Sequence, residues 1–309
     1  MKHDHHLRTE PSAGYELLDS GENMKLERFG EVVVARPETQ ALWAKMRPEL
    51  WKNAHATFAF GAKSSWDVRK ELPEPWLVPH GAMTLSARLT SFKHTGIFPE
   101  QAPNWVWTQE RIRTLKDARR EAPRVLNLFG YTGAASVSAA LAAKTAKGGS
   151  PDDLHSKSFQ GAHVTHVDSS KQSLDWARKN AELSHVPSDA IRWIPDDALA
   201  FAKREARRGA KYDGIILDPP AFGRGVKAQV WRIEEDLPKL LAMLKELLEE
   251  RPGSFFLLNG YAAGYASRSF TQAVESTFGK IDGESGELLI KETSTDRVIP
   301  AGIYVRFTR

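Results

Sequence analysis

The alternation of hydrophobic and polar positions changes character near residue 122. Beyond that point short apolar runs alternate with amphipathic stretches, a pattern typical of a parallel sheet flanked by helices. It predicts strands at 124–129, 163–167, 191–194, 212–217 and 254–258, and helices at 134–143, 171–184, 198–208, 233–250 and 268–278. Two last strands, 287–292 and 303–308, are joined by a turn too short for a helix and should be antiparallel. The expected fold is α/β, a doubly wound seven-stranded sheet.

The N-terminal part has a different pattern. Short strand-like pieces at 31–35, 56–60, 76–78 and 83–89 are separated by Gly, Pro and Asn, and one helix-like stretch covers 39–47. We therefore predict a mainly β domain over 1–92, with the first dozen residues flexible, and an α/β domain over 93–309. The stretch 147–160, rich in Gly, Ser, Pro and Asp, is interpreted as a surface insertion.

Composition narrows the possible classes of protein. The 309 residues are 41% hydrophobic, which is normal for a globular protein. The longest apolar run falls well short of a membrane span, and the first residues lack the apolar stretch of a signal peptide, so we expect a cytoplasmic protein. The net charge of +4 is compatible with nucleic acid, although basic clusters within 111–124 and 203–211 could equally be solvated helix faces.

The chain contains no cysteine, which excludes disulfides, thiolate metal sites and a thiol nucleophile. Three early histidines, His3, His5 and His6, fit a flexible polar terminus better than a metal site, and we predict no metal.

The most distinctive local feature is the turn that follows the strand at 212–217. Asp218 precedes two prolines, Pro219 and Pro220, which have no N–H and a fixed φ, so carbonyl groups beside the carboxylate could serve as acceptors. Phe222 offers a flat face for stacking, and Arg224 a positive charge for a phosphate. Taken alone, the turn is either a ligand-holding device or a sharp strand exit.

The residues at the other strand exits favour the interpretation that the turn holds a ligand. In a doubly wound sheet ligands bind over the carboxyl ends of the strands. The first strand exit contains two glycines, in the run Phe129, Gly130, Tyr131, Thr132 and Gly133. The second contains one acid, in Asp168 and Ser169, and the third contains two acids, in Asp196, Asp197 and Ala198. Carboxylates here could bind ribose hydroxyls and an adenine amino group, or cap the following helices. Together with Asp218 they predict a nucleoside cofactor site.

Three segments in this order resemble motifs of class I S-adenosylmethionine-dependent methyltransferases, which have a Rossmann-like sheet. More narrowly, the chain is similar to the bacterial family that includes large-subunit ribosomal RNA methyltransferases. The segments are Thr95 to Gln101 (TGxFxDQ, with Glu100 in place of Asp), Leu126 to Gly133 (LNLFxYTG) and Asp218 to Phe222 (DPPxF).

The resemblance implies S-adenosyl-L-methionine as the cofactor. It also implies that residues 129–133 lie along its methionine part, that Asp168 binds the ribose and that Asp197 or Asp196 binds the adenine amino group. Asp218 would lie next to the sulfonium. Thr95, Gly96, Phe98 and Gln101 would close over the cofactor, unless this segment simply links the domains.

The absence of cysteine limits which atom of the substrate can accept the methyl group. Methylation of pyrimidine carbon 5 requires a thiolate, so we predict a nitrogen acceptor, with oxygen second. Asp218 and the Pro219 carbonyl would accept the protons of an amine while Phe222 stacks on the base. Asn259 could orient the substrate or belong to a strand-end turn.

Three hypotheses follow from the sequence. The first is a methyltransferase acting on RNA, with ribosomal RNA as the substrate. The second is a methyltransferase for a protein side chain or a small molecule. The third is a non-catalytic RNA-binding protein that retains a cofactor pocket.

Overall fold

The computed structural model describes residues 5–59, 64–118, 121–142, 161–224, 230–261 and 264–309. The predicted insertion at 147–160 lies outside these residues. The chain forms two compact units: a C-terminal unit of residues 1–6, 103–287 and 302–309, and an N-terminal unit of residues 7–102 and 288–301. The predicted boundary lies at residue 92, whereas the N-terminal unit runs to residue 102 and also includes the segment 288–301.

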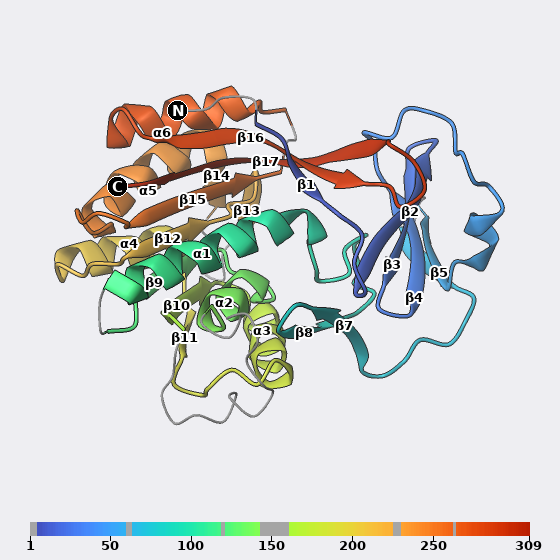
Figure 1. Ribbon diagram of the computed structural model, residues 1–309, viewed down its shortest axis with the longest axis horizontal. Coiled ribbons are helices and arrows are strands. Elements are labelled where there is room, and N and C mark those ends of the chain that lie inside the picture. Colours follow the sequence, from blue (N-terminus) through green and yellow to red (C-terminus); the bar gives the residue numbers. More distant parts are fainter. Residues whose placement is uncertain (1–4, 60–63, 119–120, 143–160, 225–229, 262–263) are drawn as a thin grey trace. The chain divides into compact units, whose positions relative to one another are not determined.

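The C-terminal unit is built on the sheet that the sequence predicts (Figure 1). Its strands are β9 (Arg124–Leu128), β10 (His163–Asp168), β11 (Ile191–Pro195), β12 (Gly214–Leu217), β15 (Phe255–Gly260), β16 (Gly283–Lys291) and β17 (Val298–Thr308). They occur in the order β16-β17-β15-β12-β9-β10-β11, with β17 antiparallel to β15 and the central strands parallel. An eighth strand that was not predicted, β1 (Leu7–Thr9), pairs with residues 288–290 of β16, and both of these segments belong to the N-terminal unit.

The chain reverses its direction of travel across the sheet at β9, which pairs with β10 on one side and with β12 on the other. A doubly wound sheet opens a crevice at such a point. The helices are α1 (Ala102–Ala118), α2 (Ala134–Ala140), α3 (Lys171–Leu183), α4 (Ala198–Arg207), α5 (Ile233–Leu247) and α6 (Ser267–Phe278). Helix α1 is absent from the predicted helices, whereas the other five match them.

Burial explains why these segments are helical and how they pack. In α5, Leu237, Leu240, Leu241 and Leu244 recur at helical spacing and all are buried. They belong to the same apolar core as Leu126, Leu128, Ile215 and Leu217 of the central strands. The sheet is thus held by a continuous core, and the strand ends are left to carry polar groups.

The N-terminal unit contains a five-stranded sheet and a separate hairpin. The sheet runs in the order β2 (Tyr15–Gly21), β3 (Met24–Phe29), β4 (Val32–Pro37), β5 (Ala56–Ala59) and β6 (Ser65–Val68), and the hairpin is β7 (Trp76–His80) with β8 (Met83–Ala87). The mainly β prediction is therefore confirmed, although β2, β3 and β6 were not predicted. Two short 3₁₀ turns cover Leu50–Asn53 and Pro99–Gln101.

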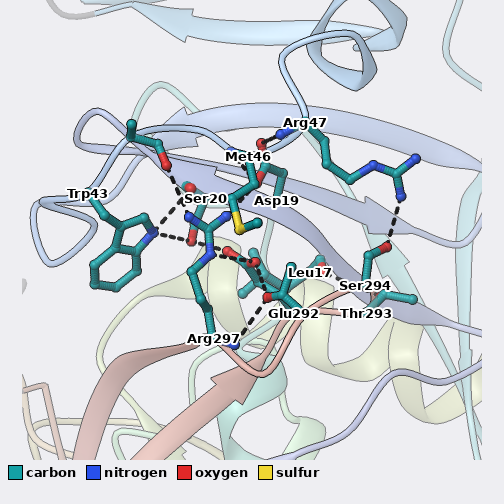
Figure 2. A network of polar contacts seen from close by, with 12 residues as sticks. Leu17, Asp19, Ser20, Trp43, Met46, Arg47, Glu292, Thr293, Ser294 and Arg297 are labelled. Atoms are coloured by element: carbon teal, nitrogen blue, oxygen red, sulfur yellow. Dashed lines mark hydrogen bonds and ion pairs between the residues drawn. The ribbon is translucent and has the colours of Figure 1, made fainter.

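The predicted helix at 39–47 is wrong. This segment is irregular, and the buried carboxylate of Asp19 accepts hydrogen bonds from the backbone N–H groups of Met46 and Arg47 at 3.3 and 3.1 Å. A side chain that binds these amides competes with the helical pattern. Figure 2 shows the network around Asp19.

Arg297 joins two buried acids of that network. Its guanidinium lies 2.7 Å from Asp19 Oδ1 and 2.9 Å from Glu292 Oε2, and it donates to the carbonyl of Ala44 at 3.0 Å. Glu292 also accepts a hydrogen bond from Ser20. The hairpin segment 288–301 is therefore tied to β2 within the N-terminal unit.

Among the described residues, no helix combines the length and apolar character needed to span a membrane.

Candidate functional site

The loop after β9 has an unusual backbone. Phe129 and Tyr131 adopt φ angles of 56° and 48°, and Gly133, the N-cap of α2, has φ 85°. Non-glycine residues in this region are uncommon and persist where the surrounding structure requires them, often at ligand sites. The N–H of Gly130 binds the carbonyl of Val167 at 3.1 Å, which ties the loop to β10.

Gly130 is required by close packing rather than by its φ angle. A Cβ at this position would lie 2.3 Å from Cε1 of His166. His166 is fully buried on β10, its Nδ1 is 2.9 Å from Ser136 Oγ, and that hydroxyl also accepts from Asn127 Nδ2 at 2.8 Å. Burial, with help from Arg178, lowers the pKa of His166 to about 3, so the ring is neutral. A buried polar group of three residues therefore supports the loop from below.

Asp168 ends β10 and faces the loop. Its Oδ2 accepts the N–H of Tyr131 at 2.9 Å and its Oδ1 the N–H of Ser170 at 2.8 Å. Burial raises its pKa, and the two backbone hydrogen bonds oppose that shift. The N-cap of α3 is Ser170, whose hydroxyl accepts from the N–H of Ser173. Capping by Asp168 itself, the alternative considered from the sequence, does not occur.

The two acids after β11 have different contacts. Asp197 is the N-cap of α4, and its Oδ1 accepts from the N–H of Ala200 at 2.9 Å. Asp196 forms an ion pair with Arg204 through Oδ2, and its Oδ1 accepts from the N–H of Asp197 at 2.9 Å. Both carboxylate oxygens of Asp196 thus have partners within the protein. In Asp197, the N-cap of α4 uses only one carboxylate oxygen, Oδ1.

The Asp-Pro-Pro turn follows β12, which pairs with β9. Burial raises the pKa of Asp218 to about 6. The side chain of Phe222 is 55% exposed. The carbonyl of Pro220 is engaged by Nε1 of Trp231 at 2.7 Å. Phe222 begins β13 (Phe222–Arg224), which pairs antiparallel with β14 (Val230–Arg232).

These strand ends surround a pocket that is partly open to solvent. Its lining residues are Phe129, Val167, Asp168, Ser169, Asp196, Asp197, Ala198, Pro220, Gly223 and Trp231. The structure therefore brings together seven of the predicted site residues, drawn from four strand ends. The remaining residues of the β9 loop, Gly130 to Gly133, together with Asp218 and Pro219, belong to the same strand exits without lining the pocket.

Other predicted residues lie elsewhere or are not described. Thr95, Gly96, Phe98 and Gln101 belong to the N-terminal unit, so their contact with a cofactor stays a prediction. Asn259 lies within β15 rather than in a turn, is 4% exposed, and accepts a 2.8 Å hydrogen bond from Asn104. The side chain of Arg224 lies outside the described part of the structure.

Three residues that line the pocket were not predicted from the sequence: Val167, Gly223 and Trp231. Trp231 is the largest of them. It is 6% exposed, and its ring centroid lies 4.9 Å from that of Phe129. The signal was a lone aromatic residue between the Gly-Arg-Gly loop and the amphipathic stretch of α5. Among the described residues, no group of three or more His, Asp or Glu side chains is placed to hold a metal ion.

Comparison with known proteins places this site in context. No protein-family model matches the sequence. A solved structure, described as the SAM-dependent methyltransferase from Agrobacterium tumefaciens, is 34% identical with a TM-score of 0.86, and the match covers 99% of this chain and 95% of that one.

Curated relatives match over shorter stretches. Ribosomal RNA large subunit methyltransferase K/L of a Shewanella species is 33% identical over 169 residues, which are 52% of this chain and 19% of the relative. Ribosomal RNA large subunit methyltransferase I of Salmonella arizonae is 33% identical over 158 residues, 50% of this chain and 32% of the relative. The chain therefore spans a third or less of the length of these two relatives.

Proposed function

Because the chain belongs to the S-adenosylmethionine-dependent methyltransferases, we propose that it methylates RNA, with ribosomal RNA as the first candidate, at a base nitrogen. The names of the curated relatives support the choice of ribosomal RNA. A ribosomal RNA substrate also fits the cytoplasmic location expected from the sequence.

The pocket fits the cofactor of this family. It lies at the carboxyl ends of the parallel strands, where ligands bind in doubly wound sheets, and it is lined by acidic and aromatic side chains. Asp168 offers a partly buried carboxylate for the ribose hydroxyls, and the oxygen of Asp197 that does not cap α4 can accept from the adenine amino group. When bound, the cofactor supplies an electrophilic methyl group.

The chain's own residues would hold the acceptor. The carboxylate of Asp218 and the carbonyl of Pro219 accept the N–H groups of an exocyclic amine, which leaves the nitrogen lone pair free to face the methyl group. Phe222, 55% exposed on the turn, offers a face on which the base stacks. Burial raises the pKa of this carboxylate to about 6. It is therefore ionised at neutral pH yet basic enough to take the departing proton.

The observation that carries the proposal is the partly buried Asp218 at the start of a proline turn, next to a pocket lined by three further acids, in a chain without cysteine. A thiol-dependent attack on pyrimidine carbon 5 requires a residue that this chain lacks. An amine requires only orientation and a proton acceptor.

The test is transfer of a labelled methyl group from S-adenosylmethionine to RNA. The purified protein would be incubated with total RNA, ribosomal subunits and soluble protein from cells that lack it, and labelled nucleosides would be identified by mass spectrometry. We expect an N-methylated nucleoside in RNA that is missing with Asp218→Ala. Label in protein or small molecules would favour the second hypothesis, and cofactor binding without any transfer the third.

A further inference from the structure

We propose that Trp231 is a positioning residue that fixes the Asp-Pro-Pro turn against the loop after β9, and so sets the acceptor in line with the methyl group. The inference rests on the proposed function and deepens it. It concerns a residue outside the three sequence motifs.

The turn itself has few ways to be held. Pro219 and Pro220 have no N–H, so the turn can be fixed at these positions only through its carbonyl oxygens or by packing. The N–H of Asp218 is 3.4 Å from the Leu128 carbonyl, and the Ala221 carbonyl accepts from Ile233 N at 3.2 Å. The bond from Trp231 Nε1 to the Pro220 carbonyl, at 2.7 Å, is the shortest of the three. The indole therefore supplies a donor that the turn cannot supply itself.

The same indole also contacts the loop after β9. Its ring meets Phe129 at 4.9 Å with an interplanar angle of 61°. Phe129 has positive φ and is the first residue of the glycine loop. One rigid side chain thus contacts both the loop predicted to lie along the methionine part and the turn predicted to hold the acceptor.

The strand pairing explains how Trp231 reaches this place. In the antiparallel register of β13 and β14, Gly223 lies opposite Trp231, and Phe222 lies opposite Arg232. Because facing residues share a side of a β-ribbon and successive residues alternate, Trp231 and Phe222 point to opposite faces. Trp231 is 6% exposed, whereas Phe222 is 55% exposed. Seating the indole therefore also fixes the direction in which Phe222 presents its ring.

A residue with this task should affect turnover more than cofactor affinity. Methyl transfer depends on the alignment of donor and acceptor, and small misplacements cost large factors in rate. The carboxylates of Asp168 and Asp197 do not depend on the indole hydrogen bond. Loss of the N–H should therefore lower kcat and leave cofactor binding almost unchanged.

The deciding variant is Trp231→Phe, which keeps an aromatic ring and removes the donor. A matched control is Trp76→Phe in the N-terminal unit, where another buried indole donates to a backbone carbonyl, that of Phe29, at 2.8 Å. Both variants lose one hydrogen bond of the same kind. A purely structural role for Trp231 predicts the same loss of melting temperature and the same modest change in activity for both.

Three quantities would be measured for each variant: the Kd of S-adenosylhomocysteine by calorimetry, kcat and KM for the labelled RNA, and hydrogen exchange of peptides covering residues 217–223 in the cofactor-free protein. For Trp231→Phe we expect a fall in kcat of about ten-fold or more, a Kd within about three-fold of wild type, and faster exchange of the Ala221 and Phe222 amides. Trp76→Phe should leave all three unchanged.

The inference is overturned if Trp231→Phe keeps wild-type kcat and wild-type exchange, or if its kcat falls only in step with cofactor affinity. A failure of the proposed function looks different, because the wild-type protein itself would then not methylate RNA. In that case the exchange measurement still reports whether the indole holds the turn.

Discussion

The backbone N–H of Tyr131 donates a 2.9 Å hydrogen bond to Oδ2 of Asp168, which joins the loop after β9 to the end of β10. A carboxylate that organises a loop in this way has further lone pairs for a ligand. We expect Asp168→Ala to weaken binding of S-adenosylhomocysteine by about ten-fold or more, since hydrogen bonds to charged groups contribute about 1.5–3 kcal/mol each. Calorimetry measures the affinity, and unchanged binding would contradict the ribose assignment.

Asp197 has two roles that substitution can separate. Its Oδ1 caps α4 through the N–H of Ala200, and its carboxylate is the proposed partner of the adenine amino group. Serine keeps the cap but removes the carboxylate, whereas alanine removes both. We expect Asp197→Ser and Asp197→Ala to lose cofactor affinity equally, with the alanine variant less stable by about 1 kcal/mol. Full affinity in Asp197→Ser would refute the adenine assignment.

Asp218 makes stability and activity depend on pH in opposite directions. Its pKa is about 6 in the folded protein, above the ordinary 3.8, because burial disfavours the charge. Between these values the folded state keeps a proton that the unfolded state has lost. Stability therefore falls as pH rises through this window, and the penalty approaches about 3 kcal/mol above about pH 7.

Asp218→Asn should accordingly be more stable than wild type at pH 8, with the difference vanishing toward pH 4. Urea denaturation of both proteins at several pH values measures this difference in stability. The wild-type methylation rate should drop below about pH 6, where the carboxylate becomes protonated, and the asparagine variant should be nearly inactive throughout. A stability difference that does not change with pH would contradict the buried carboxylate.

Substitutions of Gly130 and His166 should have strongly non-additive effects on stability. A Cβ at residue 130 would lie 2.3 Å from the imidazole, so Gly130→Ala should displace the loop, destabilise the protein by about 1–3 kcal/mol and weaken cofactor binding. His166→Ala makes room for the methyl group. The double variant should therefore be more stable than the sum of the single effects predicts, and additive effects in this cycle would rule out the steric account.

Substitution of Arg297 tests how much the buried network of the N-terminal unit contributes to stability. Its removal leaves Asp19, 1% exposed, and Glu292, fully buried, without their cation. We expect Arg297→Ala to lower the free energy of unfolding by about 3–5 kcal/mol. The control is Arg69→Ala, whose ion pair with Asp67 is exposed on both sides and which should cost less than about 1 kcal/mol. Similar losses in both variants would show that the network contributes little.

The sequence determined the sheet and most of the pocket. Apolar runs and amphipathic periods are local properties, and the carboxyl ends of parallel strands must meet at one edge of a sheet. Asp168, Asp197 and the Asp-Pro-Pro turn could therefore be placed together from the sequence alone. The missing cysteine narrowed the chemistry in the same way.

Tertiary structure decided the features that depend on distant partners. Asp19 binds the backbone of residues 46 and 47 and so replaces a helix that local periodicity predicts. Strand β1 forms only because β16 pairs with it across some 280 residues of chain. Trp231 enters the pocket through the register of a short hairpin, and its hydrogen bond to Pro220 has no signature in sequence spacing. Local patterns fix which face of an element is buried, whereas the partner that satisfies a buried polar group is chosen only when the elements pack.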